Sequence, residues 1–366
     1  MTSTSPIFVT ARFRTGSTML WHLLRQLEHV TAYYEPCNDN LLEHVRGNTP
    51  VQESHYAVDS YWDEYQPLMD RLPALHANAF GVSRLSLEAS DDWPELERYL
   101  RFLLERSVPR RPVLQMNRVD FRLPWLKARF PDAIIVHLFR NPRDQWLSMT
   151  RGLADDRASD PDENTNYDLV VWAVALSAVF PFLVGPHIRH SYERHYLIWK
   201  LSYLMGVRCS TVSLSYDDDF RRDPRQGLTR LLRAIGVSTD SVSQLEAGVR
   251  RPSRQNELAA PARADWEVME ASCDALLDRL GLTECFGTVA LADIRRTHGA
   301  AWEPFAALAH GEAIRLGGVT LSRFRSHYLD TVRAMRQLGE NARNVEAALL
   351  DTERRLRGAT GAPPVK

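Results

Sequence analysis

The sequence of 366 residues has few cysteines, no excess of charge of either sign and no apolar leader. Cys37, Cys209, Cys273 and Cys285 include no CxxC pair, which argues against a structural metal site or a disulfide framework and favours a reducing, cytoplasmic compartment. The 45 Lys and Arg residues nearly cancel the 46 Asp and Glu residues, so the composition does not indicate nucleic acid as a partner. We therefore expect any anion site to be local.

The sequence also lacks an apolar run long enough to cross a bilayer with ease. The start, MTSTSPIF, has neither the basic nor the apolar region of a signal peptide. The longest apolar run, residues 169–184, is short for a membrane span and carries Pro181 near its end. It predicts a buried core helix, with a shallow membrane contact as the alternative.

What the sequence does contain is a series of short apolar, β-branched stretches separated by helix-length segments. They lie at residues 6–11, 112–117, 133–140 and 210–216, with a further strand in the segment TAYYEPCND. Continuous apolar strands that alternate with helices indicate a parallel sheet covered on both faces. The sequence therefore predicts an α/β fold of three layers. The acidic segment 154–168 has no periodicity and predicts a mobile surface loop.

The character of the chain changes near residue 320. From Leu321 to Leu356, mainly apolar residues recur at alternating spacings of three and four over about five heptads. This pattern indicates a coiled coil and a homo-oligomer formed through residues 320–357. A long amphipathic helix packed on its own subunit is the alternative. We expect a catalytic domain at 1–285, a helical connector at 286–319, the long helix at 320–357 and a flexible tail at 358–366.

A candidate anion site follows the first strand. The turn ARFRTGST precedes an apolar helix, so several backbone N–H groups and two hydroxyls would point at one place at a helix N-terminus. A nucleotide hydrolase or kinase would need G-x-x-x-x-G-K-[ST], but Ala11 replaces the first Gly and Ser17 stands in the place of the Lys. A triphosphate is therefore disfavoured. A plain strand-to-helix turn is the alternative for this motif taken alone.

A second candidate phosphate site follows the strand at 133–140. Arg140 closes that strand, Pro142 forces a turn, and Ser148 lies eight residues after Arg140, on the helix that follows. If the turn folds the chain back, a guanidinium and a hydroxyl can hold one phosphate between them.

Together these segments resemble the sulfotransferases that use 3′-phosphoadenosine 5′-phosphosulfate (PAPS), and the resemblance extends over roughly residues 6–255. It implies a P-loop-like fold with a central parallel sheet, no metal, and a donor site in which Arg140 and Ser148 bind the 3′-phosphate. Tyr216, in the turn SYDDDF, would lie near the adenine. Of the basic loop residues Arg250, Arg251 and Arg254, Arg254 is taken as a 3′-phosphate contact, with a solvated surface cluster as the alternative. The 5′-phosphosulfate would be cradled by Arg14, Thr15, Gly16, Ser17, Thr18 and Met19.

The same resemblance implies two catalytic residues. Arg14 stands where cytosolic members usually carry a Lys, so it would stabilise the bridging oxygen, or merely neutralise the phosphate. The usual His after the strand at 112–117 is absent, because that region reads Gln-Met-Asn-Arg. Glu35 resembles the Glu of the Tyr/Phe-Glu-Pro segment in carbohydrate sulfotransferases and is the candidate base, with an ion-pair partner for an Arg as the alternative. His22 is a second candidate base, although a buried neutral role suits it better, and His137 predicts a core histidine.

The sequence thus indicates transfer of a sulfuryl group from PAPS to a hydroxyl of a carbohydrate or glycosylated small molecule. Asn117 and Arg118 follow a central strand and are expected near the acceptor. The alternatives are the same chemistry on a phenol, a lipid or a peptide tyrosine, or an inactive assembly protein that uses its coiled coil.

Overall fold

The computed structural model describes residues 5–47, 60–164, 166–249 and 263–321. The chain divides into two compact units, residues 1–314 and 315–366, and the second is described only over the helical residues 315–321. The predicted coiled coil and tail therefore lie outside the described residues from residue 322 onward. They stay predictions, as do the domain boundaries.

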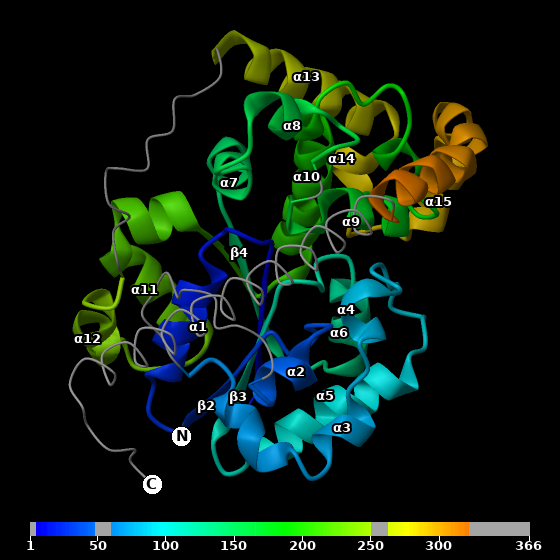
Figure 1. The fold of residues 1–366 in the computed structure, drawn as a ribbon. Coiled ribbons are helices and arrows are strands. Elements are labelled where there is room, and N and C mark those ends of the chain that lie inside the picture. Colours follow the sequence, from blue (N-terminus) through cyan, green and yellow to red (C-terminus); the bar gives the residue numbers. More distant parts are fainter. Residues whose placement is uncertain (1–4, 48–59, 165, 250–262, 322–366) are drawn as a thin grey trace, which may run out of the picture. The chain divides into compact units, whose positions relative to one another are not determined.

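Five parallel strands form the centre of the first unit (Figure 1). Their order in the sheet is β2-β3-β1-β4-β5, so the first strand lies in the middle. All five predicted strands are confirmed, and their bounds are β1 Ile7–Ala11, β2 Val30–Tyr34, β3 Arg111–Met116, β4 Ile134–Phe139 and β5 Val212–Ser215.

The sheet is covered on both faces because its strands are apolar on both sides. Side chains alternate along β1, so that Ile7 and Val9 pack with the helices α1 (Ser17–Arg25), α11 (Pro224–Ala234) and α12 (Val242–Glu246). Phe8 points to the opposite face, where its ring centroid lies 5.3 Å from that of Phe130. The helices α5 (Pro94–Ser107) and α10 (Ser191–Cys209) contact the sheet without belonging to the α1 cluster. The prediction of three layers is confirmed.

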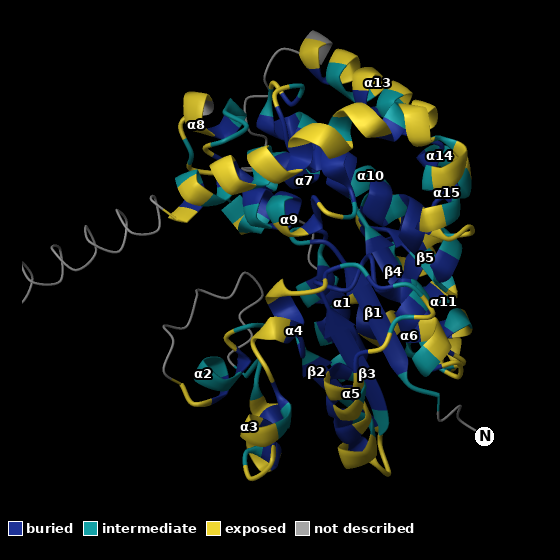
Figure 2. Ribbon diagram, turned by 90° about the vertical axis from the view of Figure 1, so that its right-hand side faces the viewer, coloured by how far each residue is buried: buried dark blue, intermediate teal, exposed yellow. Residues whose placement is uncertain are grey.

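The remaining helices connect or extend these layers, and Figure 2 shows that the strands are coloured as buried, whereas outer helices such as α3 and α13 carry many exposed residues. Residues 299–321 form a further helix. The other helices are α2 Leu41–Val45, α3 Leu72–Leu75, α4 Ala79–Val82, α6 Leu123–Arg129, α7 Pro142–Met149, α8 Asp155–Ser159, α9 Leu169–Leu176, α13 Arg263–Arg279, α14 Leu282–Cys285 and α15 Leu291–Thr297.

The apolar run 169–184 is buried as predicted, but it is not one helix. Helix α9 ends at Leu176, and a short 3₁₀ turn, Pro181–Leu183, follows. Proline has no N–H to continue a helix and disfavours helical backbone at the residue before it; Phe180 accordingly has φ −126° and ψ 77°. No helix within the described ranges is both long enough and apolar enough to span a bilayer.

The acidic segment 154–168 has more structure than its composition predicts. It contains α8, and the buried side chain of Asn164 donates hydrogen bonds to the carbonyl of Ala158 and to Ser191 Oγ, at 3.0 and 3.2 Å. The carboxylate of Asp160 accepts the backbone N–H groups of Asp162 and Glu163. The mobility predicted for this surface segment stays a prediction, but the segment contains a short helix, because short polar side chains bond to nearby backbone where an apolar pattern is missing.

Candidate functional site

Each of the five strands is followed by a candidate functional residue. These residues are Arg14 after β1, Glu35 after β2, Asn117 after β3, Arg140 after β4 and Tyr216 after β5. Because the strands are all parallel, their carboxyl ends meet at one edge of the sheet, where open α/β folds bind ligands. The fold therefore brings the predicted residues to one edge.

The turn between β1 and α1 has the backbone of an anion cradle. Arg14 and Gly16 both have left-handed backbone, with φ of 64° and 93°, and Gly16 caps the N-terminus of α1. A Cβ on Gly16 would lie 2.5 Å from Cδ2 of Tyr216, so only glycine fits beneath that ring. Arg14, which has no such freedom, is held in a sparsely populated conformation of the kind that clusters at functional sites.

A buried ion pair links the start of this turn to the loop after β3. Arg12 Nη1 lies 3.0 Å from Asp120 Oδ2, both side chains are at most 5% exposed, and Thr10 donates to the same carboxylate. The Arg12 guanidinium also lies 4.4 Å from the ring centroid of Trp172. This pair is not predictable from the sequence, because a buried Arg-Asp contact between two strand ends has no local sequence pattern.

Arg14, Arg140, Ser148 and Tyr216 converge beside the cradle. Arg14 Nε donates to Ser148 Oγ at 3.0 Å, and Arg140 Nη1 donates to the carbonyl of Arg14 at 3.1 Å. The Arg140 guanidinium lies 5.1 Å from the Tyr216 ring centroid. The predicted cradle and the predicted Arg/Ser pair thus form one cluster, although the hydroxyl of Ser148 meets Arg14 rather than Arg140.

The other cradle residues divide between the site and the core. Thr18 Oγ1 lies 2.9 Å from the hydroxyl of Tyr34, and Thr15 Oγ1 donates to the carbonyl of Arg12. The side chain of Met19 belongs to the hydrophobic core. Met19 can therefore offer the site its backbone N–H but not its side chain.

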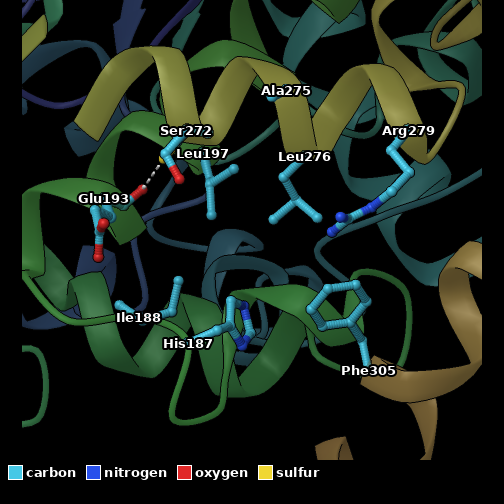
Figure 3. Close-up of a pocket in the computed structure, with 10 residues that line it drawn as sticks. His187, Ile188, Glu193, Leu197, Ser272, Ala275, Leu276, Arg279 and Phe305 are labelled. Atoms are coloured by element: carbon cyan, nitrogen blue, oxygen red, sulfur yellow. Dashed lines mark hydrogen bonds between the residues drawn. The ribbon is translucent and has the colours of Figure 1, made fainter. Parts of the chain in front are cut away.

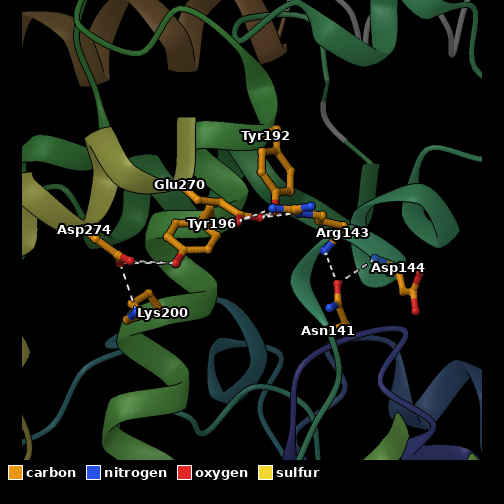
Figure 4. Close-up of polar contacts among 8 residues, drawn as sticks. All are labelled: Asn141, Arg143, Asp144, Tyr192, Tyr196, Lys200, Glu270 and Asp274. Carbon is orange, nitrogen blue, oxygen red and sulfur yellow. Dashed lines mark hydrogen bonds and ion pairs between the residues drawn. The ribbon is translucent and has the colours of Figure 1, made fainter. Parts of the chain in front are cut away.

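Helix α7, which carries Ser148, is held at its start by two neighbours. Asn141 caps it by accepting the N–H groups of Arg143 and Asp144. Arg143 in turn donates two hydrogen bonds, of 2.8 and 2.7 Å, to the carboxylate of Glu270 on α13, which also accepts the hydroxyl of Tyr192 (Figure 4). Burial raises the pKa of Glu270, but hydrogen bonds from Arg143 and Tyr192 outweigh it and bring that pKa below its ordinary value.

Glu35 lies at the other side of the cradle, between two side-chain amides. Asn117 Nδ2 donates to Glu35 Oε1 at 2.6 Å, and Asn38 Nδ2 donates to Oε2 at 3.0 Å. Glu35 is also left-handed, with φ 41°. Burial raises the pKa of its carboxyl above the ordinary value, against the opposing effects of the Arg118 charge and of these hydrogen bonds. A carboxylate with a raised pKa is suited to accepting a proton near neutral pH.

Arg118 pairs with carboxylates other than Glu35. Its Nη2 lies 3.1 Å from Asp39 Oδ1, and its Nη1 lies 3.8 Å from Asp168 Oδ2. Beside Asp168, Tyr167 is 39% exposed, and its ring centroid lies 5.7 Å from the Arg14 guanidinium. The sequence analysis missed Asp39, Tyr167 and Asp168, because distant loops bring them together.

Two histidines, His22 and His137, are also singled out by the sequence. His22 is half-buried on α1, one turn after Thr18. His137 is buried in β4 with Nδ1 2.8 Å from Ser213 Oγ, and burial lowers its pKa to about 3, so its prediction as a neutral core histidine is confirmed. Arg254, with Arg250 and Arg251, lies outside the described residues.

A cavity of about 280 Å³ lies elsewhere in the first unit, between α10, α13 and the helix that begins at residue 299 (Figure 3). It is lined by residues such as Leu197, Leu276 and Phe305, and none of its lining residues belongs to the cradle or to the Glu35 cluster. Within the described ranges, no group of three or more His, Cys, Asp or Glu side chains is arranged to hold a metal ion.

Known proteins that are similar to this chain are found among solved structures. A search of curated proteins finds no match to the chain. Two solved structures are similar: a sulfotransferase domain from the curacin biosynthetic pathway (13% identity, 75% of this chain and 99% of that one, TM-score 0.40) and a sulfotransferase from Alicyclobacillus acidocaldarius (16%, 80% and 99%, TM-score 0.38). TM-scores this low support no inference about the site.

The family comparison is more direct. Residues 6–184 match the model of the sulfotransferase family. The matched segment contains the cradle, Glu35, Arg140 and Ser148, whereas Tyr216 lies beyond it. Over residues 6–184, just under half of its length, this chain has the sequence pattern of the sulfotransferase family.

Proposed function

We propose that the protein transfers a sulfuryl group from PAPS to a hydroxyl of a carbohydrate or glycosylated small molecule. The observation that carries this proposal is the convergence of Arg14, Arg140, Ser148 and Tyr216 on the left-handed turn at Gly16. Two guanidinium groups, a hydroxyl and the N-terminus of α1 face one place, and this is the chemistry that binds a nucleotide with two separate phosphate groups.

The residues present fit such a donor. Arg140 Nε is buried without a hydrogen-bond partner, so the guanidinium has a donor to spare for a phosphate oxygen. The ring of Tyr216 closes over Gly16 beside the Arg140 guanidinium, and the adenine is expected next to it. PAPS would supply the sulfuryl group, which the chain itself does not carry.

Two residues take part directly in the proposed reaction. Arg14, whose Nε donates to Ser148 Oγ beside the cradle, supplies a fixed positive charge where negative charge develops on the leaving phosphate. Glu35 accepts the proton of the acceptor hydroxyl. Neither role needs a metal ion.

The surroundings of Glu35 support a polyhydroxyl acceptor over a phenol. Asp39, Arg118 and Asp168 offer charged hydrogen-bonding groups next to the carboxylate, and the exposed ring of Tyr167 provides a flat apolar surface. A phenol site would be mostly apolar. An inactive assembly protein is the second candidate, favoured only by the heptads at 320–357, and it gives no reason for the Arg14–Ser148–Arg140 cluster.

The donor is tested by thermal-shift titration with 3′-phosphoadenosine 5′-phosphate (PAP), the expected product, beside AMP and ATP. We expect PAP to stabilise the protein selectively, and Arg140→Ala to weaken PAP binding by about tenfold or more, because it removes a charge-assisted contact. Arg222→Ala is the matched control, since Arg222 is exposed and pairs only with Asp218 among the ion pairs of the described residues. Equal stabilisation by ATP, or an unchanged affinity in Arg140→Ala, would contradict the proposed donor site.

A further inference from the structure

The carboxylate of Glu35 is held at both oxygens, and the amides that hold it are themselves held. Asn38 Nδ2 donates to one oxygen and Asn117 Nδ2 to the other. The carbonyl oxygen of Asn38 accepts the backbone N–H of Asn40 at 2.8 Å, and that of Asn117 accepts the side-chain amide of Gln115 at 2.6 Å. We call Asn38 and Asn117, with these two supporting donors, the amide bracket.

The orientation of both side-chain amides in the bracket is fixed by their supporting donors. A backbone N–H can only donate, so the atom of Asn38 that faces Asn40 is its oxygen, and its NH₂ group must face Glu35. Gln115 fixes Asn117 in the same sense, because it donates to the Asn117 oxygen. Gln115 is fully buried and Asn117 is 4% exposed, so water has little access to exchange these partners. Both oxygens of Glu35 therefore meet donors, which suit a carboxylate and not the O–H of a carboxylic acid.

The fold explains why these groups meet. Strands β2 and β3 are adjacent and parallel, and Tyr34 lies opposite Gln115 in their register. Glu35 and Asn117 thus leave neighbouring strands one or two residues after that pair, on the same edge of the sheet. The left-handed backbone of Glu35 turns the chain into the loop that carries Asn38, whose N–H donates to the Glu35 carbonyl at 2.9 Å.

We propose that Asn38 and Asn117 are positioning residues, which hold Glu35 in its ionised form with lone pairs left for the acceptor hydroxyl. A carboxylate has about four lone-pair sites, and the bracket uses two of them. The role of Glu35 as base rests on the proposed function, but the action of the bracket on its carboxylate does not.

Other groups near Glu35 act on the same carboxylate. Tyr34 of β2 hydrogen-bonds to it, and Arg118, from the loop after β3, lowers its pKa by its charge. Asp39 and Asp168 pair with Arg118, and the buried Cys37 thiol, whose pKa is raised by burial, is also near. Because these groups stay in place in variants of Asn38 and Asn117, a change in the titration of Glu35 reports on the bracket.

The test is an NMR titration of the free protein labelled with ¹³C at glutamate carboxyl groups. The resonance of Glu35 is the one that Glu35→Gln removes. A hydrogen bond to a charged group contributes about 1.5–3 kcal/mol, so losing one should raise the pKa of Glu35 by about 1 to 2. We expect this rise in Asn117→Ala and in Asn38→Ala, a smaller rise in Gln115→Met, and none in Gln26→Glu, an exposed control at the end of α1.

Unchanged titration of Glu35 in both Asn38→Ala and Asn117→Ala would overturn the proposal. Asn38 lies in a loop and is half-buried, so its variant remains informative if loss of the buried Asn117 prevents folding. Once an acceptor is known, kcat/KM should rise with pH as Glu35 loses its proton. In the variants, the pKa read from this rise should be higher by the same amount, with PAP affinity unchanged. A shifted titration in a protein that neither binds PAP nor transfers sulfate would reject the proposed function and leave the bracket standing.

Discussion

Glu35 is a carboxylate whose surroundings act on its pKa in opposite directions. Burial raises the pKa, the charge of Arg118 and the amide donors lower it, and the net result lies above the ordinary value. A raised pKa means that the carboxylate binds a proton more tightly than an ordinary Glu does, which suits a general base. The same burial that suits catalysis works against stability, since the folded state prefers the protonated form.

We predict that Glu35→Gln lowers kcat by about 100-fold or more, with PAP affinity unchanged, because it removes the general base. The stability of the two proteins should also respond differently to pH. The folded-state pKa of Glu35 is raised, so the wild type loses stability relative to the variant as pH rises from below the ordinary Glu pKa through the raised one. Thermal melts across pH 3 to about 8 measure this difference. A wild type that becomes more stable relative to the variant as pH rises through that range would contradict the raised pKa of Glu35.

The residues of the site differ in how far sequence could predict them. Gly16, Arg140 and Ser148 lie in contiguous motifs whose spacing reflects one turn or one helix, and the fold places them together. Asp39 and Asp168 join the site through Arg118, across loops that have no periodicity. Their place depends on tertiary packing, which a motif does not encode.

At the scale of elements, α13 connects a late part of the chain to the donor side of the site. Glu270 of α13 pairs with Arg143 on the first turn of α7. The ring centroid of Trp266, also of α13, lies 5.2 Å from that of Trp146 of α7. Farther along α13, Asp274 instead contacts Tyr196 and Lys200 of α10 (Figure 4). Helix α13 thus makes one polar contact with α7, which carries Ser148, and a second, similar polar contact with α10, which does not.

We predict that Glu270→Gln weakens PAP binding several-fold and lowers stability by about 1–2 kcal/mol, because Arg143 loses its partly buried partner. Asp274→Asn is the matched control and should reduce stability without changing PAP affinity. The lowered pKa of Glu270 means that its contribution is present above the ordinary Glu pKa and is lost as pH falls. Isothermal titration with PAP and urea unfolding measure both effects; equal PAP affinities in the two variants would show that α13 does not position α7.

Element prediction succeeded where the apolar pattern was continuous and failed where polar contacts define the backbone. The five strands were predicted because buried parallel strands are apolar throughout. The apolar run 169–184 predicts one helix, but the helix ends at Leu176 and the backbone at Phe180, before Pro181, is not helical. Segment 154–168 predicts a mobile surface loop, and its short helix is missed because the bonds of Asn164 and Asp160 do not affect hydropathy.

At the scale of the whole molecule, the chain forms two units, and the proposed donor and acceptor residues that the structure describes all lie in the first. The heptads of residues 320–357 lie wholly in the second. Chemistry and proposed self-association are therefore assigned to different units.

We predict that deleting residues 320–366 lowers the mass of the particle in solution to that of one shortened chain, while PAP binding persists. Multi-angle light scattering and the thermal-shift titration measure the two properties on the same sample. Unchanged mass would favour a long helix packed on its own subunit over a coiled coil.

The five strands contribute one residue each to the candidate site, from Arg14 after the first to Tyr216 after the last. No stretch of the chain shorter than this span contains all five. During synthesis the cradle emerges early, yet Tyr216, which covers Gly16, follows about two hundred residues later. A nascent chain would thus acquire the complete site only after its last strand has joined the sheet, so premature release at any earlier point yields a product without it.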